Sequence, residues 1–208
     1  MARALDILGD RWTLLLIREL LLGPKRFKDL LATLPAMGTN RLSERLAMLV
    51  DSGVIRATTL PALPATPAYE LTGLGEHLRK PLLALGLWGL NLPVDERIDP
   101  SSARAELIAL CLTGVSDPIS SAGLHKIVEF QVGAETFHIL INDGNVLARS
   151  GAPAAPADLH AACDMDTFMA LALRQIAASS ALRKGQVRLL RGSQQAFTRV
   201  FRILEYKP

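Results

Sequence analysis

The clearest pattern of apolar and polar positions lies in residues 39–52. Four apolar side chains recur there at the spacing of one helical face, and they are Leu42, Leu46, Leu49 and Val50. A shorter amphipathic segment covers residues 28–32, and a break with proline and glycine at 35–38 separates the two segments. This arrangement predicts a helix-turn-helix whose second helix buries its apolar face against the rest of the domain.

The second helix of this motif has suitable residues at both ends. Thr39 can cap it with its hydroxyl, and Gly53 can adopt the left-handed conformation that ends a helix. At ~1.5 Å per residue the helix is about 21 Å long. Its start carries residue types that read base edges, and we expect base contacts from Thr39, Asn40, Arg41 and Ser43. The alternative is an ordinary helical hairpin whose polar face meets water.

Positive side chains surround the motif. Residues 12–22 are apolar nearly all round, which predicts a central helix capped by Asp10 and anchored by Trp12. Basic residues follow just before and inside the first helix of the motif, and two more arginines come later. The expected phosphate contacts are Lys25, Arg26, Lys28, Arg45 and Arg56. A solvated turn is the alternative for residues 25–28.

A β-hairpin is predicted after the motif. Residues 54–60 and 69–71 have the composition of strands. Between them lies the proline-rich stretch PALPATPA at 61–68, which we expect to form the hairpin tip because proline cannot continue a ladder. The hairpin would be the wing of a winged helix.

Two more helices are predicted after the wing. Thr72 can cap a helix over residues 75–80, and Pro81 can begin the next one. The residues from 82 to 90 are apolar on several faces of that last helix. An interface with a second subunit would bury them.

These N-terminal residues match a family pattern. The run ALDILGDRWTLLLIRELLLGPKRFKDLLATLPAMGTNRLSERLAMLVDSGVI, followed by YELTGLGEHL, resembles the HxlR-type winged-helix transcriptional regulators, relatives of the MarR type, over about residues 3–92. The order GDRW, NRLSERL and LTGLG is far more specific than a helix-turn-helix alone. The resemblance implies a homodimer that reads a two-fold-symmetric double-stranded DNA operator, with its recognition helices ~34 Å apart.

The chain departs from the family pattern at two places. The family usually has an N-terminal cysteine that senses oxidants or electrophiles in some members, whereas the first cysteine here is Cys111, so we expect no thiol sensing at the N-terminus. The family's wing often carries an arginine before its tyrosine, whereas this chain has Thr66, Pro67 and Ala68. We therefore expect the wing to contribute little, with Arg56 at its base as the remaining candidate.

A second domain is predicted beyond a linker at residues 93–102, where prolines and charges occur without periodicity. Its pattern predicts the order helix, strands, helix, strand, helix. Apolar residues alternate at 128–132 and 137–141, and an Asp-Gly turn follows at 143–144. The expected class is α+β, with an antiparallel sheet layered by helices. The helices are expected at 103–112, at 167–177 and after Ser193.

This second domain resembles the sterol carrier protein type 2 fold across about residues 103–206. The resemblance rests on VEFQVGAETFHILINDGNVLARSGAPAAPADLHAACDMDTFMALALRQ and then KGQVRLLRGSQQAFTRVFRIL. That family implies a tunnel that holds fatty acyl chains, sterols or other apolar molecules. The side chains expected to line it are Phe130, Phe137, Ile139, Phe168, Leu171, Leu173, Phe197 and Phe201. Each of them taken singly is also explained as core packing.

Composition narrows the class of protein. Half of the 208 residues are hydrophobic, which is enough for two globular domains, at 1–92 and 103–208. The net charge is +3, and the whole surplus lies in residues 1–92, where phosphates would be met. The longest apolar segment is shorter than the ~18 residues of a membrane-spanning helix, and no secretory signal is recognisable. We therefore expect a cytoplasmic protein without a membrane partner.

No catalytic or metal-binding constellation is recognisable. The four histidines, His77, His125, His138 and His160, lack metal-ligand spacing. Cys111 and Cys163 are expected to be buried, inert thiols. We expect no enzyme activity and no cofactor.

The leading hypothesis is a ligand-responsive regulator that binds an operator as a homodimer and holds an apolar small-molecule effector in its C-terminal domain. A rival hypothesis is a carrier of apolar molecules whose winged helix serves mainly for dimerisation. A third is a constitutive repressor whose second domain is a packed scaffold.

Overall fold

The computed structural model describes residues 1–60, 63–90 and 103–204. It divides into two compact units, Met1–Leu85 and Gly86–Pro208, and each is described by itself. The predicted linker lies outside the described residues. In the part of the chain that the structure describes, no helix is both long and apolar enough to cross a membrane.

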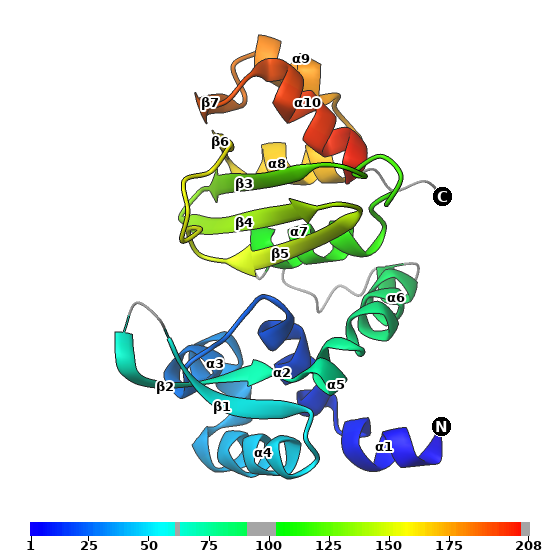
Figure 1. The fold of residues 1–208 in the computed structure, drawn as a ribbon, viewed down its shortest axis with the longest axis vertical. Coiled ribbons are helices and arrows are strands. Elements are labelled where there is room, and N and C mark those ends of the chain that lie inside the picture. The colour runs from blue at the N-terminus through cyan, green and yellow to red at the C-terminus, as the bar shows by residue number, and fades with distance from the viewer. Residues whose placement is uncertain (61–62, 91–102, 205–208) are drawn as a thin grey trace. The chain divides into compact units, whose positions relative to one another are not determined.

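The N-terminal unit combines helices with one small sheet (Figure 1). The elements, in chain order, are α1 (Ala2–Leu8), α2 (Arg11–Leu21), α3 (Phe27–Thr33), α4 (Thr39–Asp51), β1 (Ile55–Leu60), β2 (Leu63–Leu71), α5 (Gly73–Glu76) and α6 (Arg79–Leu90), whose last five residues fall in the second unit. A 3-10 turn, Pro35–Met37, separates α3 from α4. The predicted helix-turn-helix is confirmed.

Helix α2 forms the centre of this unit. The Asp10 carboxylate caps it by accepting a hydrogen bond from the Trp12 backbone N–H at 2.8 Å. One face of the helix is fully buried through Leu16, Ile17 and Leu20. Trp12 is buried, as predicted, and the Arg11 guanidinium carbon lies 4.6 Å from the centroid of its ring.

Helix α4 has the predicted length but differs at two predicted positions. Gly38, at φ +73°, occupies the cap position, and Thr39 is the first helical residue, so the prediction that Thr39 caps the helix is wrong. Leu42, Leu46 and Leu49 are buried, whereas Val50 is 39% exposed. At about 100° per residue, Val50 lies well to one side of the three leucines, because it is turned about 80° from Leu42.

The wing is a two-stranded antiparallel sheet that is longer than predicted. Strand β2 begins at Leu63, so the expectation that all of residues 61–68 form the hairpin tip is wrong. The backbone N–H and C=O of Tyr69 bond to Lys25, on the side away from β1. Pro67, two residues earlier, therefore also turns its nitrogen away from β1, where the ladder needs no donor.

Short helices follow the wing. The Thr72 hydroxyl caps α5 by accepting from the Gly75 N–H, and it donates to the Gly53 carbonyl at 2.6 Å. Pro81 lies in the first turn of α6, close to the predicted helix start. Two large apolar side chains of α6, Leu85 and Trp88, are exposed, and Trp88 is 61% exposed.

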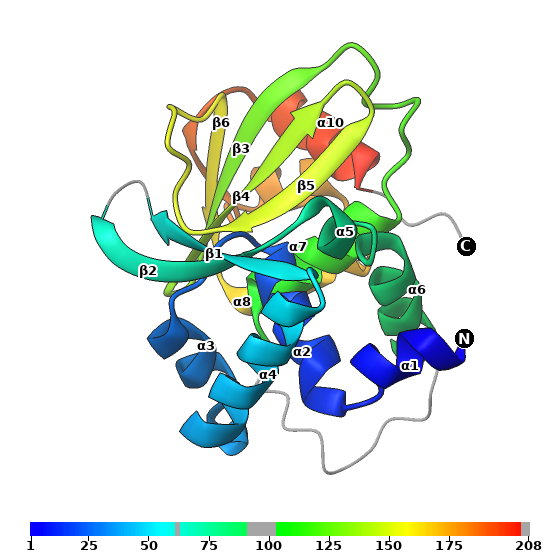
Figure 2. The same cartoon turned by 60° about the horizontal axis from the view of Figure 1, so that its bottom comes forward.

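The C-terminal unit is a five-stranded sheet with helices. Its elements are α7 (Ala105–Gly114), β3 (His125–Val132), β4 (Glu135–Asn142), β5 (Asn145–Ser150), β6 (Leu159–Cys163), α8 (Met165–Ala172), α9 (Ala178–Arg183), β7 (Arg188–Arg191) and α10 (Gln194–Ile203). The strand order is β5-β4-β3-β6-β7. Figure 1 and Figure 2 both show α7, α8 and α10 on one face of the sheet.

The sheet is mixed, so the prediction of an antiparallel sheet is wrong at one pair. The strands β3, β4 and β5 form the predicted antiparallel meander, and Asp143 and Gly144 make its second tight turn with positive φ. Strand β6 is parallel to β3. After β5 the chain returns to the far side of β3 through residues 151–158 before it enters β6, and this crossover makes the pair parallel.

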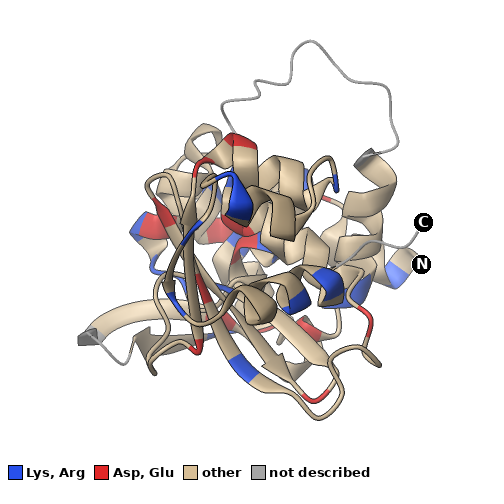
Figure 3. Ribbon diagram, turned by 90° about the horizontal axis from the view of Figure 1, so that it is seen from above, with Lys and Arg blue, Asp and Glu red and all other residues tan. Residues whose placement is uncertain are grey.

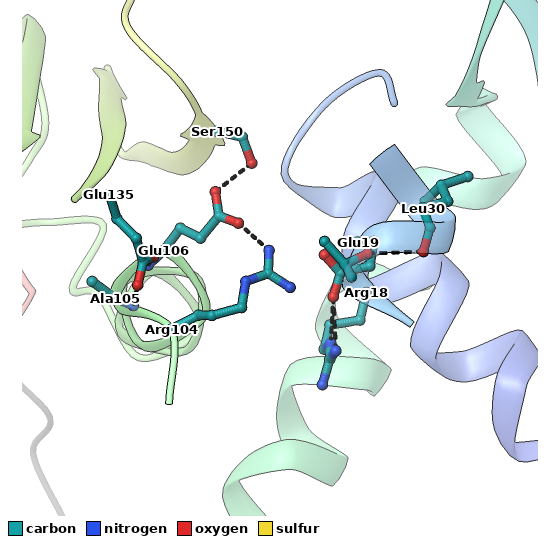
Figure 4. Close-up of polar contacts among 9 residues, drawn as sticks. Arg18, Glu19, Leu30, Arg104, Ala105, Glu106, Glu135 and Ser150 are labelled. Carbon is teal, nitrogen blue, oxygen red and sulfur yellow. Dashed lines mark hydrogen bonds and ion pairs between the residues drawn. The ribbon is translucent and has the colours of Figure 1, made fainter. Parts of the chain in front are cut away.

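Glu135 anchors α7 to the sheet. Its carboxylate oxygens accept hydrogen bonds from the backbone N–H groups of Ala105 and Glu106 at 3.1 and 3.3 Å, at the start of α7 (Figure 4). The Glu106 carboxylate in turn bonds to Arg104 and to the Ser150 hydroxyl. Arg104 occupies the cap position of α7 but its side chain makes no capping hydrogen bond. Glu135, a strand residue, therefore supplies the cap.

The helix predicted at 167–177 is shorter in the structure. Asp164 caps α8 by accepting from the Thr167 N–H at 2.7 Å, which also lowers the pKa of Asp164. Arg174 then adopts a left-handed conformation, φ +59°, so the helical pattern stops there. The following helix α9 was not predicted. Ser193 caps α10 as predicted.

Candidate nucleic-acid interface and ligand cavities

The start of α4 presents polar side chains to solvent. Thr39, Asn40, Arg41 and Ser43 are all exposed, because the leucines of the same helix are buried on the other face. Arg41 forms no ion pair within the described residues. The sequence prediction therefore identifies four neighbouring side chains that are available for contact.

Arg45 differs from these four because it packs against α2. Its Nη2 lies 3.5 Å from Oδ2 of Asp10, and about a third of its side chain is exposed. Its buried Nε has no hydrogen-bond partner. Asp10 also caps α2, so one carboxylate connects the start of α2 with the middle of α4.

Two of the other predicted phosphate-binding arginines pair with carboxylates. Arg26 and Asp29 form two charge-assisted hydrogen bonds, at 2.7 and 2.8 Å, and these hold the pKa of Asp29 below its ordinary value. In the wing, Nη2 of Arg56 on β1 lies 2.8 Å from Oε1 of Glu70, the residue that faces it on β2. A guanidinium has five N–H donors, so both arginines have donors left for a phosphate. A closer approach to the phosphate would weaken the existing ion pair.

The two lysines of the predicted set occupy different environments. Lys28 is exposed on α3, and Lys25 is half-buried where its backbone joins β2. Together with Arg41, Lys28 is therefore the most accessible cation of the helix-turn-helix.

Buried or half-buried polar groups of α2 and α6 also form interactions in this unit, and the sequence did not predict them. Glu19 is 0% exposed, and its Oε1 lies 2.7 Å from Nη2 of Arg18 (Figure 4). Arg79 of α6 donates to the Leu21 carbonyl at 3.0 Å and pairs with Glu76. The sequence feature that could have predicted them is the glutamate inside the apolar run of α2, because a buried charged residue requires a partner.

The apolar residues predicted to line a ligand tunnel form an aromatic core in the C-terminal unit. The Phe130 ring centroid lies 5.4 Å from that of Phe137, 5.8 Å from that of Phe168 and 6.0 Å from that of Phe201. The buried members of the predicted set are Phe130, Phe137, Ile139, Phe168, Leu171, Phe197 and Phe201. Leu173 is 58% exposed and does not belong to this core.

A large cavity lies between the sheet and α10. Its volume is about 940 Å³, and apolar side chains from both sides line it, among them Val128, Ile141, Leu159 and Val200. None of the eight predicted tunnel residues lines this cavity. A smaller cavity of about 310 Å³ includes Leu171 and Phe201 from the predicted set. Sequence patterns could not identify the larger cavity, because its lining combines buried apolar residues and exposed polar residues from segments that are distant in sequence.

The cysteines and histidines form no reactive cluster. Both cysteines are half-buried rather than fully buried, and burial raises the pKa of the Cys163 thiol to about 11. Among the described residues, no three potential ligands come together to hold a metal ion.

A helix-turn-helix followed by a two-stranded wing is the architecture of a winged-helix DNA-binding domain. Residues 7–95 match the HxlR-like helix-turn-helix family. The chain belongs to this family of transcriptional regulators, which its N-terminal part represents.

The similar proteins cover the same N-terminal part. The uncharacterized HTH-type transcriptional regulator YvaP of Bacillus subtilis (strain 168) is 37% identical over 99 residues, which are 48% of this chain and 87% of YvaP. The HTH-type transcriptional regulator YodB of the same organism is 35% identical over 88 residues, which are 42% of this chain and 79% of YodB. The structure of the reduced form of YodB aligns with a TM-score of 0.41 and 34% identity, over 46% of this chain and 95% of that chain.

Proposed function

We propose that this protein is a ligand-responsive transcriptional regulator that binds a two-fold-symmetric DNA operator as a homodimer. The observation that carries the proposal is the exposed polar start of α4 on a helix whose other face is buried. In a helix-turn-helix this end of the second helix enters the major groove. Membership in the HxlR-like family supports the same role.

The four exposed residues have distinct roles in this proposal. Arg41 is suited to a bidentate contact with guanine, and Asn40 to one with adenine. Thr39 and Ser43 can bond to either kind of base edge. Lys28 contacts phosphates directly, and Lys25, Arg26, Arg45 and Arg56 contribute where their present interactions permit.

The homodimer is supported by apolar surface outside the DNA-contacting face. Leu5 of α1 and Leu85 and Trp88 of α6 are exposed large hydrophobic side chains. Burying them against a second copy would remove this surface from water. A symmetric pair of α4 helices would then require two half-sites about one duplex turn apart.

The effector site of this proposal is the cavity of about 940 Å³ in the C-terminal unit. Its volume is within the range of small-molecule sites, and it combines apolar side chains of the sheet and α10 with polar and charged ones, among them Lys126, Asp158 and Arg199. An effector changes DNA binding only if it has different affinities for the DNA-binding and the non-binding forms. We therefore propose this cavity, rather than the aromatic core, as the site for an apolar molecule.

Selection of genomic DNA fragments by the full-length protein tests the proposal. We expect enrichment of a few fragments that share an inverted repeat, and an organic-solvent extract of the purified protein should change that enrichment when added back. Mass spectrometry of the extract identifies any co-purified molecule. A co-purified apolar molecule without preferential fragment enrichment would instead favour a carrier whose winged helix only dimerises.

A further inference from the structure

The charges of the C-terminal unit are segregated along the chain. Residues 167–204 contain seven Lys and Arg and no Asp or Glu, whereas residues 103–166 contain three Lys and Arg and eight Asp and Glu. The basic stretch covers most of α8 and all of α9, β7 and α10. The balanced total for residues 93–208 therefore conceals two halves of opposite charge.

The basic residues gather at one edge of the unit. Strand β7 is the edge strand of the sheet, and α9 packs against α10. Figure 1 shows these three elements together, and Figure 3 marks the basic and acidic residues along the whole ribbon. We call this surface the basic edge, and its residues are Arg174, Arg183, Lys184, Arg188, Arg191, Arg199 and Arg202.

Six of these seven cations are available to a partner. All seven are exposed, and within the described residues the six other than Arg174 form no ion pair. The carboxylate of Asp158 attracts Arg191 electrostatically, but it already accepts hydrogen bonds from Lys126 at 2.8 Å and from the Ile127 N–H at 2.9 Å. The basic edge therefore has positive charge that the fold does not neutralise.

A surface field of a single sign attracts oppositely charged partners and speeds their association, whereas interspersed charges of both signs do not. Five of the six available cations are arginines, which bind phosphate oxygens through a planar fork of N–H groups. Because both units belong to one chain, a duplex held by α4 is presented to the C-terminal unit at high effective concentration.

We propose that the basic edge is a second DNA-contacting surface, which binds the phosphate backbone of duplex DNA without reading its sequence. The inference rests on the proposed function, because the N-terminal unit must first hold a duplex. In this arrangement α4 supplies sequence preference, and the C-terminal unit adds salt-dependent affinity.

The test compares the salt dependence of DNA binding by the full-length protein and two double variants. One variant removes charge from α9, R183Q/K184Q, and the other from α10, R199Q/R202Q. The matched control, R3Q/K80Q, lowers the net charge equally, but its two exposed cations belong to α1 and α6 and not to the basic edge. Circular dichroism and thermal unfolding verify that all three variants are folded.

Binding is titrated by fluorescence anisotropy on an enriched fragment and on a scrambled duplex of the same length. In at least one edge variant, the slope of log K against log salt should become shallower on both duplexes, by about 0.9 for each phosphate that the variant no longer neutralises. The control should keep the wild-type slope. Wild-type slopes in both edge variants on both duplexes would overturn the inference.

The outcomes separate this inference from the proposed function. If the wild-type protein does not distinguish the two duplexes, the proposed regulator function fails, while the slopes still test the basic edge. Co-sedimentation with phosphatidylglycerol vesicles is measured in parallel. Vesicle binding that the edge variants lose, together with unchanged DNA slopes, would assign the edge to an anionic membrane and overturn the inference.

Discussion

Asp10 connects α2, the central helix of the N-terminal unit, to α4 through Arg45. One carboxylate oxygen accepts the Trp12 N–H at the start of α2, and the other lies 3.5 Å from Nη2 of Arg45 on α4. The two helices belong to segments 35 residues apart in sequence, and this carboxylate contacts both of them. Asp10 therefore contributes to the position of α4 as well as to the cap of α2.

The cap should account for most of the stability that Asp10 provides. We expect Asp10→Ala to lower the free energy of unfolding by about 1 kcal/mol, because Ala removes the cap. Asp10→Asn should cost much less, since Asn caps a helix and a half-exposed ion pair contributes little. Urea unfolding measures both changes. Equal destabilisation by the two variants would show that the charge of Asp10 matters more than its cap.

Phe137 should behave as a core residue. Its ring is 0% exposed and packs 5.4 Å from Phe130 and 5.5 Å from Phe168, measured between centroids. We expect Phe137→Ala to lower the free energy of unfolding by about 3–5 kcal/mol. The control Leu173→Ala, at an exposed position, should change it by less than about 0.5 kcal/mol. A decrease below about 1 kcal/mol for Phe137→Ala would mean that the ring faces an open tunnel.

The ion pair between Arg26 and Asp29 should make a pH-dependent contribution to stability. Hydrogen bonds from Arg26 hold the pKa of Asp29 below its ordinary value of 3.8. The pKa in the folded state is thus below that in the unfolded state, so this stabilisation is present above the unfolded pKa and is lost as pH falls through the folded pKa.

The variant Arg26→Gln tests this relationship. We expect a small loss of stability at pH 7, and we expect the difference from the wild type to shrink as the pH falls below about 4. Urea unfolding at pH 7 and at pH 3.5 gives the two differences. A difference that grows at the acidic pH would contradict the assigned pair.

Cys163 should resist alkylation in the folded protein. Burial raises the pKa of its thiol to about 11, so only a very small fraction is thiolate at pH 8. Iodoacetamide at pH 8 should therefore leave Cys163 unmodified in the native protein and modify it in urea, as peptide mass spectrometry can measure. Rapid alkylation of Cys163 in the native protein would contradict the raised pKa of its thiol.

Much of the fold could be predicted because local signals agreed with tertiary packing. Leu42, Leu46 and Leu49 are buried where helical periodicity placed them, and Asp10, Thr72 and Ser193 cap the helices that follow them. The errors occurred where tertiary context decides. The backbone hydrogen bonds between Lys25 and Tyr69 orient β2 so that Pro67 fits in the strand without breaking the ladder. The crossover after β5 makes β6 parallel to β3.

The candidate site was predictable only in part. The exposed start of α4 follows from periodicity, because the buried leucines define the opposite face. The pairing of Arg45 with Asp10 and the lining of the larger cavity depend on segments that are distant in sequence. Composition of the whole C-terminal half likewise concealed the basic edge, since its charges cancel those of residues 93–166.

The central claim is that α4 reads DNA sequence, and Arg41 tests it most directly. Fluorescence anisotropy should compare the wild type, Arg41→Ala and the control Arg3→Ala on an enriched fragment and on a scrambled duplex. We predict that Arg41→Ala weakens binding to the enriched fragment by about 1–3 kcal/mol and reduces the preference over the scrambled duplex, while Arg3→Ala changes neither. Wild-type affinity and preference in Arg41→Ala would contradict the account.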